Sequence, residues 1–330
     1  SNCGAYELLF SDVHTGKQIT KARELRDVRW TSWTCCLGWP VQSIWQGGMD
    51  GSDINAVDRS HSSHLVAVGD DSSHISVYRY PCIGTDNKML TLKGHSSHVM
   101  NVRWSAGDEY LLSAGGNDKC IMQWKHYVPG ATHENTSYSD ENTEQETVHT
   151  DNTVEVAETT VTSIDDPFAS GPSGGDESTA VQPWRGAIRP PSILPNVYPS
   201  KPNSSLSLKW VHGFTSGFAG TNGARVSANL RYNCDRNPVF PAAALGVVLQ
   251  RNSSDKTNTQ QIYFEGHDDD VLCLCISADG RFIATGQTAS KSSKGKGSVS
   301  IWDATDCRLL SRLEAVSYTH LTLPTKWIGV

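Results

Sequence analysis

Residues 94–124 read GHSSHVMNVRWSAGDEYLLSAGGNDKCIMQW, and this stretch decides the fold. Between residues 99 and 104, side chains alternate with the period of two that is typical of a β-strand whose faces differ. A polar turn follows, and residues 111–114 form the next apolar run. The Gly-Gly-Asn-Asp sequence after it predicts a tight turn into a third strand, which ends at Trp124.

The same pattern recurs on both sides of this stretch. Residues 266–303 begin with Gly-His, continue as DDDVLCLCISADGRFIATGQ, and close with GSVSIWD after an insertion rich in Ser, Lys and Gly. Residues 53–78 form a weaker copy, with Tyr78 in the place of the closing Trp and no Gly-His pair. Each copy resembles one WD40 repeat, the four-stranded blade of a β-propeller. The predicted fold class is therefore all-β, with an incomplete set of WD40 blades.

The WD40 resemblance also implies a role for the polar residues of the repeats. In that family a His, a Ser or Thr, an Asp and a Trp form one buried hydrogen-bonded set, because buried polar groups destabilise a fold unless they are paired. Ala114 stands where one copy would be expected to carry its hydroxyl, and in the other copy the insertion displaces the Asp. The repeat explains these residues as structural rather than as metal ligands or acid–base catalysts. By resemblance the sets contain His95, Asp118 and Trp124 in one copy, and His267, Thr285 and Trp302 in the other.

The composition narrows the class of protein. The net charge is -7, yet residues 131–180 hold twelve Asp and Glu and no Lys or Arg, so the rest of the chain is mildly basic. An acidic total without a basic stripe argues against nucleic acid as a partner. With no run of 18 apolar residues and no leading signal peptide, we expect a soluble cytoplasmic protein and no membrane contact. The nine cysteines lack CxxC spacing, which favours reduced thiols over a zinc site or a disulfide framework.

The pattern divides the chain into four parts. Residues 1–128 are expected to be the last blades of one propeller unit, and residues 129–203 a disordered acidic linker rich in Ser, Thr and Pro. Residues 204–314 are expected to carry a hydrophobic motif and the first blade of a following unit. Residues 315–330 show no blade pattern and are expected to be a non-native tail. Because the chain starts at Ser1 within a pattern, we expect a piece of a longer protein.

Longer runs narrow the resemblance further. Residues 7–19 (ELLFSDVHTGKQI), 25–61 and 66–82 (VAVGDDSSHISVYRYPC) resemble the end of a propeller unit in the echinoderm microtubule-associated protein-like family. Residues 207–217 (SLKWVHGFTSG) and 239–251 resemble the hydrophobic motif that opens each unit there. That order is similar to a junction in the larger members, which carry tandem units. The resemblance implies a non-catalytic cytoskeletal protein that binds tubulin or microtubules, modulates their assembly, and meets other proteins through its propeller rims.

Three segments have more than one interpretation. Residues 20–45 hold four tryptophans, which form either extra packed strands near 27–33 and 41–45 or an aromatic binding ledge; packing is favoured because Trp mostly buries its area. Residues 242–249 are apolar and predict one buried strand. The insertion in the last copy is either a solvated loop, the favoured reading, or a contact for the acidic surface of tubulin through Lys291, Lys294 and Lys296.

Two other functions remain open. A general WD40 adaptor in a signalling or ubiquitin-ligase complex would use the same scaffold without microtubules. An enzyme built on a propeller would need convergent polar residues, yet the chain has no P-loop, GxSxG or HExxH spacing. We therefore predict no enzymatic activity, no catalytic or metal site, and no cofactor.

Overall fold

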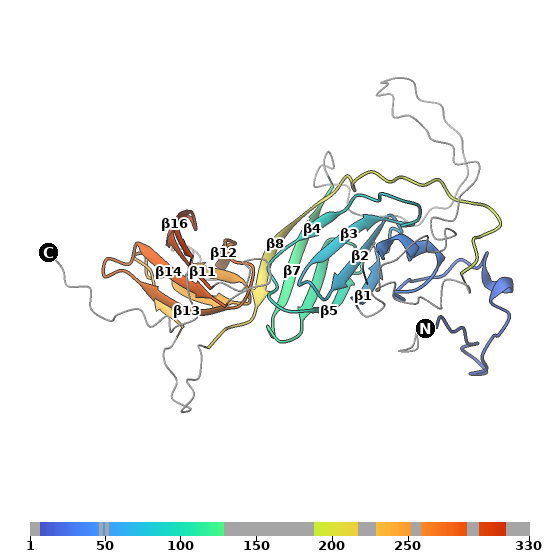
Figure 1. Ribbon diagram of the computed structural model, residues 1–330, viewed down its shortest axis with the longest axis horizontal. Helices are drawn as coiled ribbons and strands as arrows, with labels where there is room; N and C mark the ends of the chain where they lie inside the picture. Colours follow the sequence, from blue (N-terminus) through green and yellow to red (C-terminus); the bar gives the residue numbers. More distant parts are fainter. Residues whose placement is uncertain are drawn as a thin grey trace, which may run out of the picture.

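The computed structural model describes residues 7–45, 49, 53–128, 188–216, 229–251, 259–288 and 297–314. This part is built almost entirely of strands, which form four antiparallel sheets of four strands each. The all-β fold of WD40 blades is confirmed, and the four described sheets do not close into a ring (Figure 1). We name the sheets blades one to four in chain order.

Blades one and two hold the strands that the central sequence pattern predicts. Blade one has the order β1-β2-β3-β4, with bounds Ile54–Arg59, Leu65–Asp70, Ile75–Arg79 and Leu90–Leu92. Blade two has the order β5-β6-β7-β8, with bounds Val99–Trp104, Tyr110–Gly115, Ile121–Tyr127 and Ser205–His212. The strands predicted at 99–104, 111–114 and 121–124 are therefore confirmed as β5, β6 and β7.

Blades three and four complete the described part. Blade three has the order β12-β11-β10-β9, and its strands in chain order are Arg231–Tyr232, Pro238–Ala242, Leu245–Arg251 and Thr259–Phe264. Blade four has the order β13-β14-β15-β16, with bounds Val271–Ile276, Phe282–Gln287, Ser298–Asp303 and Leu309–Glu314. In every blade, strands that follow each other along the chain are hydrogen-bonded neighbours.

The outer strand of blade two comes from the far side of the acidic segment. Residues 205–212, expected to open a following unit, instead form β8, which pairs with β7 from Ile121↔His212 to Tyr127↔Ser205 (Figure 1). The acidic segment thus interrupts one sheet between its third and fourth strands. The other predicted boundaries between units stay predictions, and residues 129–187 and 315–330 lie outside the described part.

The end of the predicted linker contacts both the segment before blade one and blade one itself. Residues 188–203 form neither helix nor strand, but their placement is described and they are held by specific hydrogen bonds. Ser192 donates its backbone N–H and its hydroxyl to the Asp27 carboxylate at 2.6 and 2.7 Å, and Lys88 N donates to Pro199 O at 2.9 Å. The prediction of disorder is therefore wrong for this part, because proline-stiffened chain loses less entropy on docking than the composition suggested.

The predicted strand at residues 242–249 is a hairpin. Its residues are largely buried, as expected, but β10 ends at Ala242 and β11 begins at Leu245. Ala243 has a φ of 51°, the left-handed conformation that a two-residue hairpin turn requires. The turn is itself buried, and its backbone groups are paired: Ala243 O accepts from Val271 N at 3.0 Å, and Ala244 N donates to Gly94 O at 3.1 Å. The sequence pattern did not predict this turn, because its residues are small and apolar like those of the strands on either side.

The tryptophan-rich segment forms 3₁₀ helices instead of the predicted extra strands. These are η1 (Ala22–Leu25) and η2 (Trp39–Ile44), and Pro40 lies in the first turn of η2, where its fixed φ suits a helix start. The segment packs on blade one: Trp33 and Trp45 are buried, and Arg59 N donates to Trp33 O at 3.0 Å. The packing interpretation thus holds for these two tryptophans.

Adjacent blades share hydrophobic cores. One core runs from blade one through blade two to blade three and includes Val77, Met122 and Leu245. Another joins blades three and four around Val239 and Trp302. Each large aliphatic side chain buried in this way contributes about 1.5–3 kcal/mol. The blades approach closely: a Cβ at Gly69 would lie 2.8 Å from Val99 Cγ1, so only glycine fits at that place in β2.

Hydrogen bonds between blades add to this packing. The Asp108 carboxylate of blade two accepts from His61 N at 2.8 Å and from Ser62 N at 2.7 Å, both in blade one. In the other direction, the Asp58 carboxylate accepts from Trp104 N at 2.7 Å. Blades two and three are joined by Gln261, whose side-chain carbonyl accepts from Val211 N at 2.8 Å. The relative placement of neighbouring blades is therefore fixed by paired polar groups as well as by apolar contact.

Candidate functional site

Blade two contains a buried polar cluster that runs across its strands. His95 Nδ1 lies 2.7 Å from Asp118 Oδ2, and His95 Nε2 lies 2.9 Å from Ser113 Oγ. Trp124 Nε1 donates to the same Ser113 hydroxyl at 3.0 Å. The structure thus brings His95, Asp118 and Trp124 together. The hydroxyl comes from Ser113, not from the position of Ala114, because the side chains of neighbouring residues in a strand point to opposite faces.

The cluster has the side-chain order of a Ser-His-Asp triad but not its accessibility. Acyl-transfer chemistry needs a serine that a substrate can reach beside a donor site for the developing oxyanion. The side chains of His95 and Asp118 are 0% exposed, and Ser113 is 1% exposed. The Ser113 hydroxyl is also occupied on two sides, by His95 and Trp124. We therefore infer that the cluster stabilises the blade.

Blade four contains the same arrangement with one different member. His267 Nε2 lies 2.7 Å from Thr285 Oγ1, and Trp302 Nε1 donates to that hydroxyl at 3.0 Å. His267 Nδ1 faces Gln287 Oε1 at 2.7 Å, where blade two has an aspartate. Sequence reasoning missed this glutamine. One signal in the sequence could have identified it. The histidine and the hydroxyl residue are 18 residues apart in both blades, so an alignment of Ser113 with Thr285 also aligns Gly115 with Gln287.

The electrostatics of His267 follow from its surroundings. Burial lowers the pKa of His267 below its usual 6.5, and the positive charge of Arg312 acts in the same direction. The hydrogen bond to Gln287 and the charge of Asp268 act against this shift without cancelling it. The folded blade therefore holds this imidazole in its neutral form, which suits one donor and one acceptor contact.

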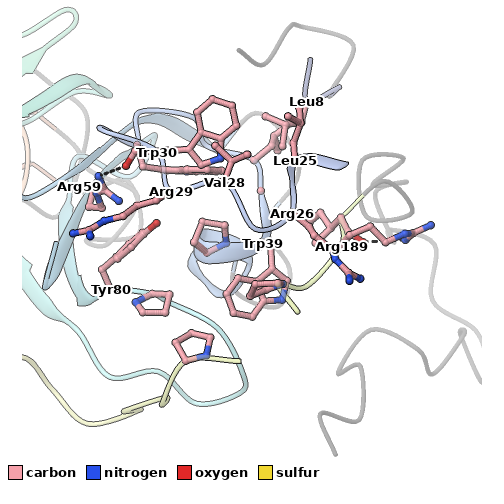
Figure 2. A pocket seen from close by; sticks show the side chains of 18 of the residues that line it. Leu8, Leu25, Arg26, Val28, Arg29, Trp30, Trp39, Arg59, Tyr80 and Arg189 are labelled. Atoms are coloured by element: carbon pink, nitrogen blue, oxygen red, sulfur yellow. Dashed lines mark hydrogen bonds between the residues drawn. The ribbon is translucent and has the colours of Figure 1, made fainter. Parts of the chain in front are cut away.

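A separate pocket lies at the tryptophan-rich segment, with a volume of about 360 Å³ (Figure 2). Its walls come from residues 8–40, from blade one and from residues 188–195. Burial raises the pKa of Tyr80, which forms part of the pocket wall, and the phenol group of this residue is therefore neutral. Trp39 is partly buried and Trp30 is exposed, and both line the pocket, so the aromatic-ledge interpretation stays a hypothesis for these two tryptophans. The charged part of the lining is cationic and consists of Arg26, Arg29, Arg59 and Arg189.

The remaining candidate contact, the lysine-rich insertion, lies outside the described part of the chain. Lys291, Lys294 and Lys296 lie outside the described residues. Within the described ranges, no group of three or more His, Cys, Asp or Glu side chains could hold a metal ion. In the same ranges, no helix combines the length and the apolar character needed to cross a membrane.

Four-stranded antiparallel blades with a His–hydroxyl–Trp cluster define a WD40 β-propeller protein. Residues 1–126 match the family model described as "Echinoderm microtubule-associated protein second beta-propeller", and residues 258–303 match "WD domain, G-beta repeat". Residues 1–126 are therefore similar to the second propeller of the echinoderm microtubule-associated proteins.

Individual relatives agree with that match. The chain is 45% identical over 124 residues to the 77 kDa echinoderm microtubule-associated protein of Lytechinus variegatus, covering 38% of this chain and 19% of that protein. It is 41% identical over 126 residues to echinoderm microtubule-associated protein-like 4 of Mus musculus, covering 38% and 13%. For echinoderm microtubule-associated protein-like 3 of Mus musculus, identity is 43% over 133 residues, covering 40% and 15%. The chain thus spans less than a fifth of these relatives' length.

Proposed function

We propose that this protein is a non-catalytic scaffold that binds tubulin or microtubules and modulates their assembly or organisation in the cytoplasm. The observation that carries the proposal is the match of residues 1–126 to a propeller of a microtubule-associated family. Relatives that are 41% to 45% identical over this region carry the words "microtubule-associated protein" in their names.

The geometry supports a scaffold because neighbouring blades are held in a fixed relation. Asp108 clamps two backbone N–H groups of blade one, and Ser96 donates its hydroxyl to Asp270 at the start of blade four. Loops anchored on such a frame present a surface of defined shape, which lowers the entropic cost of binding a large partner. The polar clusters support the absence of catalysis, since their histidines are enclosed by the blades.

The partner contact that we propose is electrostatic. Lys291, Lys294 and Lys296 are close together in the sequence, within the segment that joins β14 to β15, and their positive charge suits an acidic protein surface such as that of tubulin. Because exposed charges are screened by salt, binding of this kind should weaken as ionic strength rises.

Co-sedimentation with taxol-stabilised microtubules tests the proposal. We expect the protein to pellet with microtubules above the level of a heat-denatured sample, and to be released by added salt. Replacing the three lysines by Ala should reduce the bound fraction severalfold, whereas Lys201→Ala with Lys209→Ala, which also removes positive charge, should change it little. Pelleting no greater than that of the denatured sample would overturn microtubule binding. Equal binding by both lysine variants would remove only the proposed contact.

A further inference from the structure

We propose that the pocket beside the tryptophan-rich segment is a binding site for an acidic peptide whose carboxylates flank an aromatic or large aliphatic side chain. Neither the family match nor the proposed microtubule binding assigns a ligand to this pocket. The inference does not depend on them, because it uses only the charge, shape and lining of the pocket.

The charge of the lining is one-sided. Four arginines line the pocket and no Asp or Glu does. Asp27 lies beside it, where its carboxylate accepts from Ser192 and pairs with Arg26 Nε at 3.4 Å. Arg29 and Arg59 form no salt bridge with any residue in the described ranges. Guanidinium groups beside apolar walls bind carboxylates through paired, charge-assisted hydrogen bonds, so the pocket favours an anionic ligand.

The arginines lie at two ends of an apolar middle. Figure 2 shows Arg29 and Arg59 at one end, above Tyr80, and Arg26 and Arg189 at the other. Between these ends, Trp30 and Trp39 lie on opposite sides of the pocket. A ligand that satisfies this arrangement carries negative charge at both ends and an apolar group at its centre. A volume of 360 Å³ is within the range of pockets that hold small ligands or a few side chains.

One end of the pocket is preorganised. The Arg59 guanidinium donates to Trp30 O at 2.8 Å and to Thr31 O at 2.7 Å, and it lies 5.2 Å from the centre of the Tyr80 ring. These contacts fix the loop that carries Arg29 on blade one. The buried Arg59 Nε has no hydrogen-bond partner among the described residues. A peptide carboxylate at this end would meet an arginine that is already held in place, which lowers the entropic cost of binding.

A peptide fits this surface better than a nucleotide does. The chain's own residues 188–195 already run along the pocket without helix or strand, and Ile188, Pro191 and Pro195 contribute to its wall. Their anchoring through Ser192 shows that backbone N–H groups find acceptors on this surface. The helix start in the lining, Gly38 before η2, has a single glycine and is followed by Pro40, which has no N–H to offer a phosphate.

The test uses the whole 330-residue chain and the synthetic peptide acetyl-Glu-Asp-Phe-Asp-Glu-amide. Binding is followed by tryptophan fluorescence, to which Trp30 and Trp39 contribute, and by titration calorimetry. We expect this peptide to bind roughly tenfold or more tightly than its Gln/Asn counterpart, in line with the strength of charge-assisted contacts. Replacing the Phe of the peptide by Ala should also weaken binding. Added salt should weaken the binding of the acidic peptide but not that of its Gln/Asn counterpart.

Variants locate the site. Arg29→Ala should lower the affinity for the acidic peptide roughly tenfold. Arg29→Lys should lower this affinity less, because lysine keeps the positive charge. Arg251→Ala removes an exposed arginine at the end of β11 and should bind like the unaltered protein. Equal affinity for the acidic and amide peptides, or equal affinity of Arg29→Ala and Arg251→Ala, would overturn the proposal. So would tripolyphosphate that binds as tightly as the peptide, since it would point to a phosphate site.

Discussion

Blades two and four solve the same packing problem with different residues. In both, a buried histidine contacts a hydroxyl on the second strand, and a tryptophan on the third strand donates to that hydroxyl. They differ in the group that faces histidine Nδ1. Blade two uses the carboxylate of Asp118 from the turn after β6, whereas blade four uses the amide of Gln287 at the end of β14.

The two solutions exclude each other in space. Gln287 pairs with Val271 across the sheet, as Gly115 pairs with Val99, so the two residues hold equivalent places. A Cβ at Gly115 would lie 1.9 Å from Asp118 Oδ1, so the aspartate fits only because residue 115 has no side chain. The acceptor opposite the histidine can thus come from the turn or from the strand. A blade that takes it from the strand no longer needs the aspartate in its turn.

The largest expected effect tests whether the tryptophans of the two clusters carry equal weight. Trp302 is 0% exposed and stacks on Phe264 with ring centres 5.0 Å apart, while Trp124 is 4% exposed. Trp302→Ala should lower the free energy of unfolding by about 3–5 kcal/mol, and Trp124→Ala by a smaller amount. Urea denaturation followed by circular dichroism measures both.

Trp302→Phe is the matched control. It keeps an aromatic ring against Phe264 but removes the donor to Thr285, and should cost about 1–2 kcal/mol. A Trp124→Ala variant less stable than Trp302→Ala would contradict the ranking, and would show that the stacked pair in blade four adds little.

The second prediction asks whether the two acceptors are interchangeable. Asp118→Ala leaves the buried His95 Nδ1 and the N–H of Cys120 without their acceptor, and should cost about 2–4 kcal/mol. Adding Gly115→Gln to that variant places an amide where blade four has one. It should recover a measurable part of the loss.

The control for this rescue is Gly115→Gln alone. With Asp118 still present, the new side chain has no room, so this variant should be less stable than the unaltered protein. Thermal unfolding of the three variants checks the prediction. A double variant no more stable than Asp118→Ala would mean that the two blades reach their acceptors by routes that cannot be exchanged.

The same comparison shows what could be predicted from the sequence. Strands β5, β6 and β7 follow from alternation and turn residues, both of which are local. His95, Asp118 and Trp124 follow from the repeat. The residue type of Gln287 did not reveal its role, because the equivalent residue in blade two is Gly115, which has no side chain to face the histidine. To identify Ser113 as the source of the hydroxyl, the register of the strand must be known, because a shift of one residue moves each side chain to the opposite face of the sheet.

Contacts between distant segments account for the rest. β8 pairs with β7 although the long acidic segment separates them, and no local pattern carries that information. The pocket brings Arg26, Arg59 and Arg189 together from three segments, so their shared surface appears only in the folded chain. Ala243 forms a turn inside an apolar run because its tight backbone conformation is fixed by neighbours from two other blades.

The smallest expected effect concerns how stability depends on pH in blade four. Because Gln287 does not titrate, His267 is the member of the pair whose protonation changes with pH. Burial holds the pKa of folded His267 below 6.5, whereas the unfolded chain has the ordinary value. As pH falls through 6.5, the unfolded state therefore takes up the proton first. The contribution of His267 to stability is complete above 6.5 and declines as pH falls toward the folded-state pKa. His267→Gln removes this proton uptake, so the melting temperature of the variant should change less than that of the unaltered protein between pH 6.5 and 5. Parallel melting curves over that interval would show that the buried imidazole of blade four accepts its proton as readily as an exposed one.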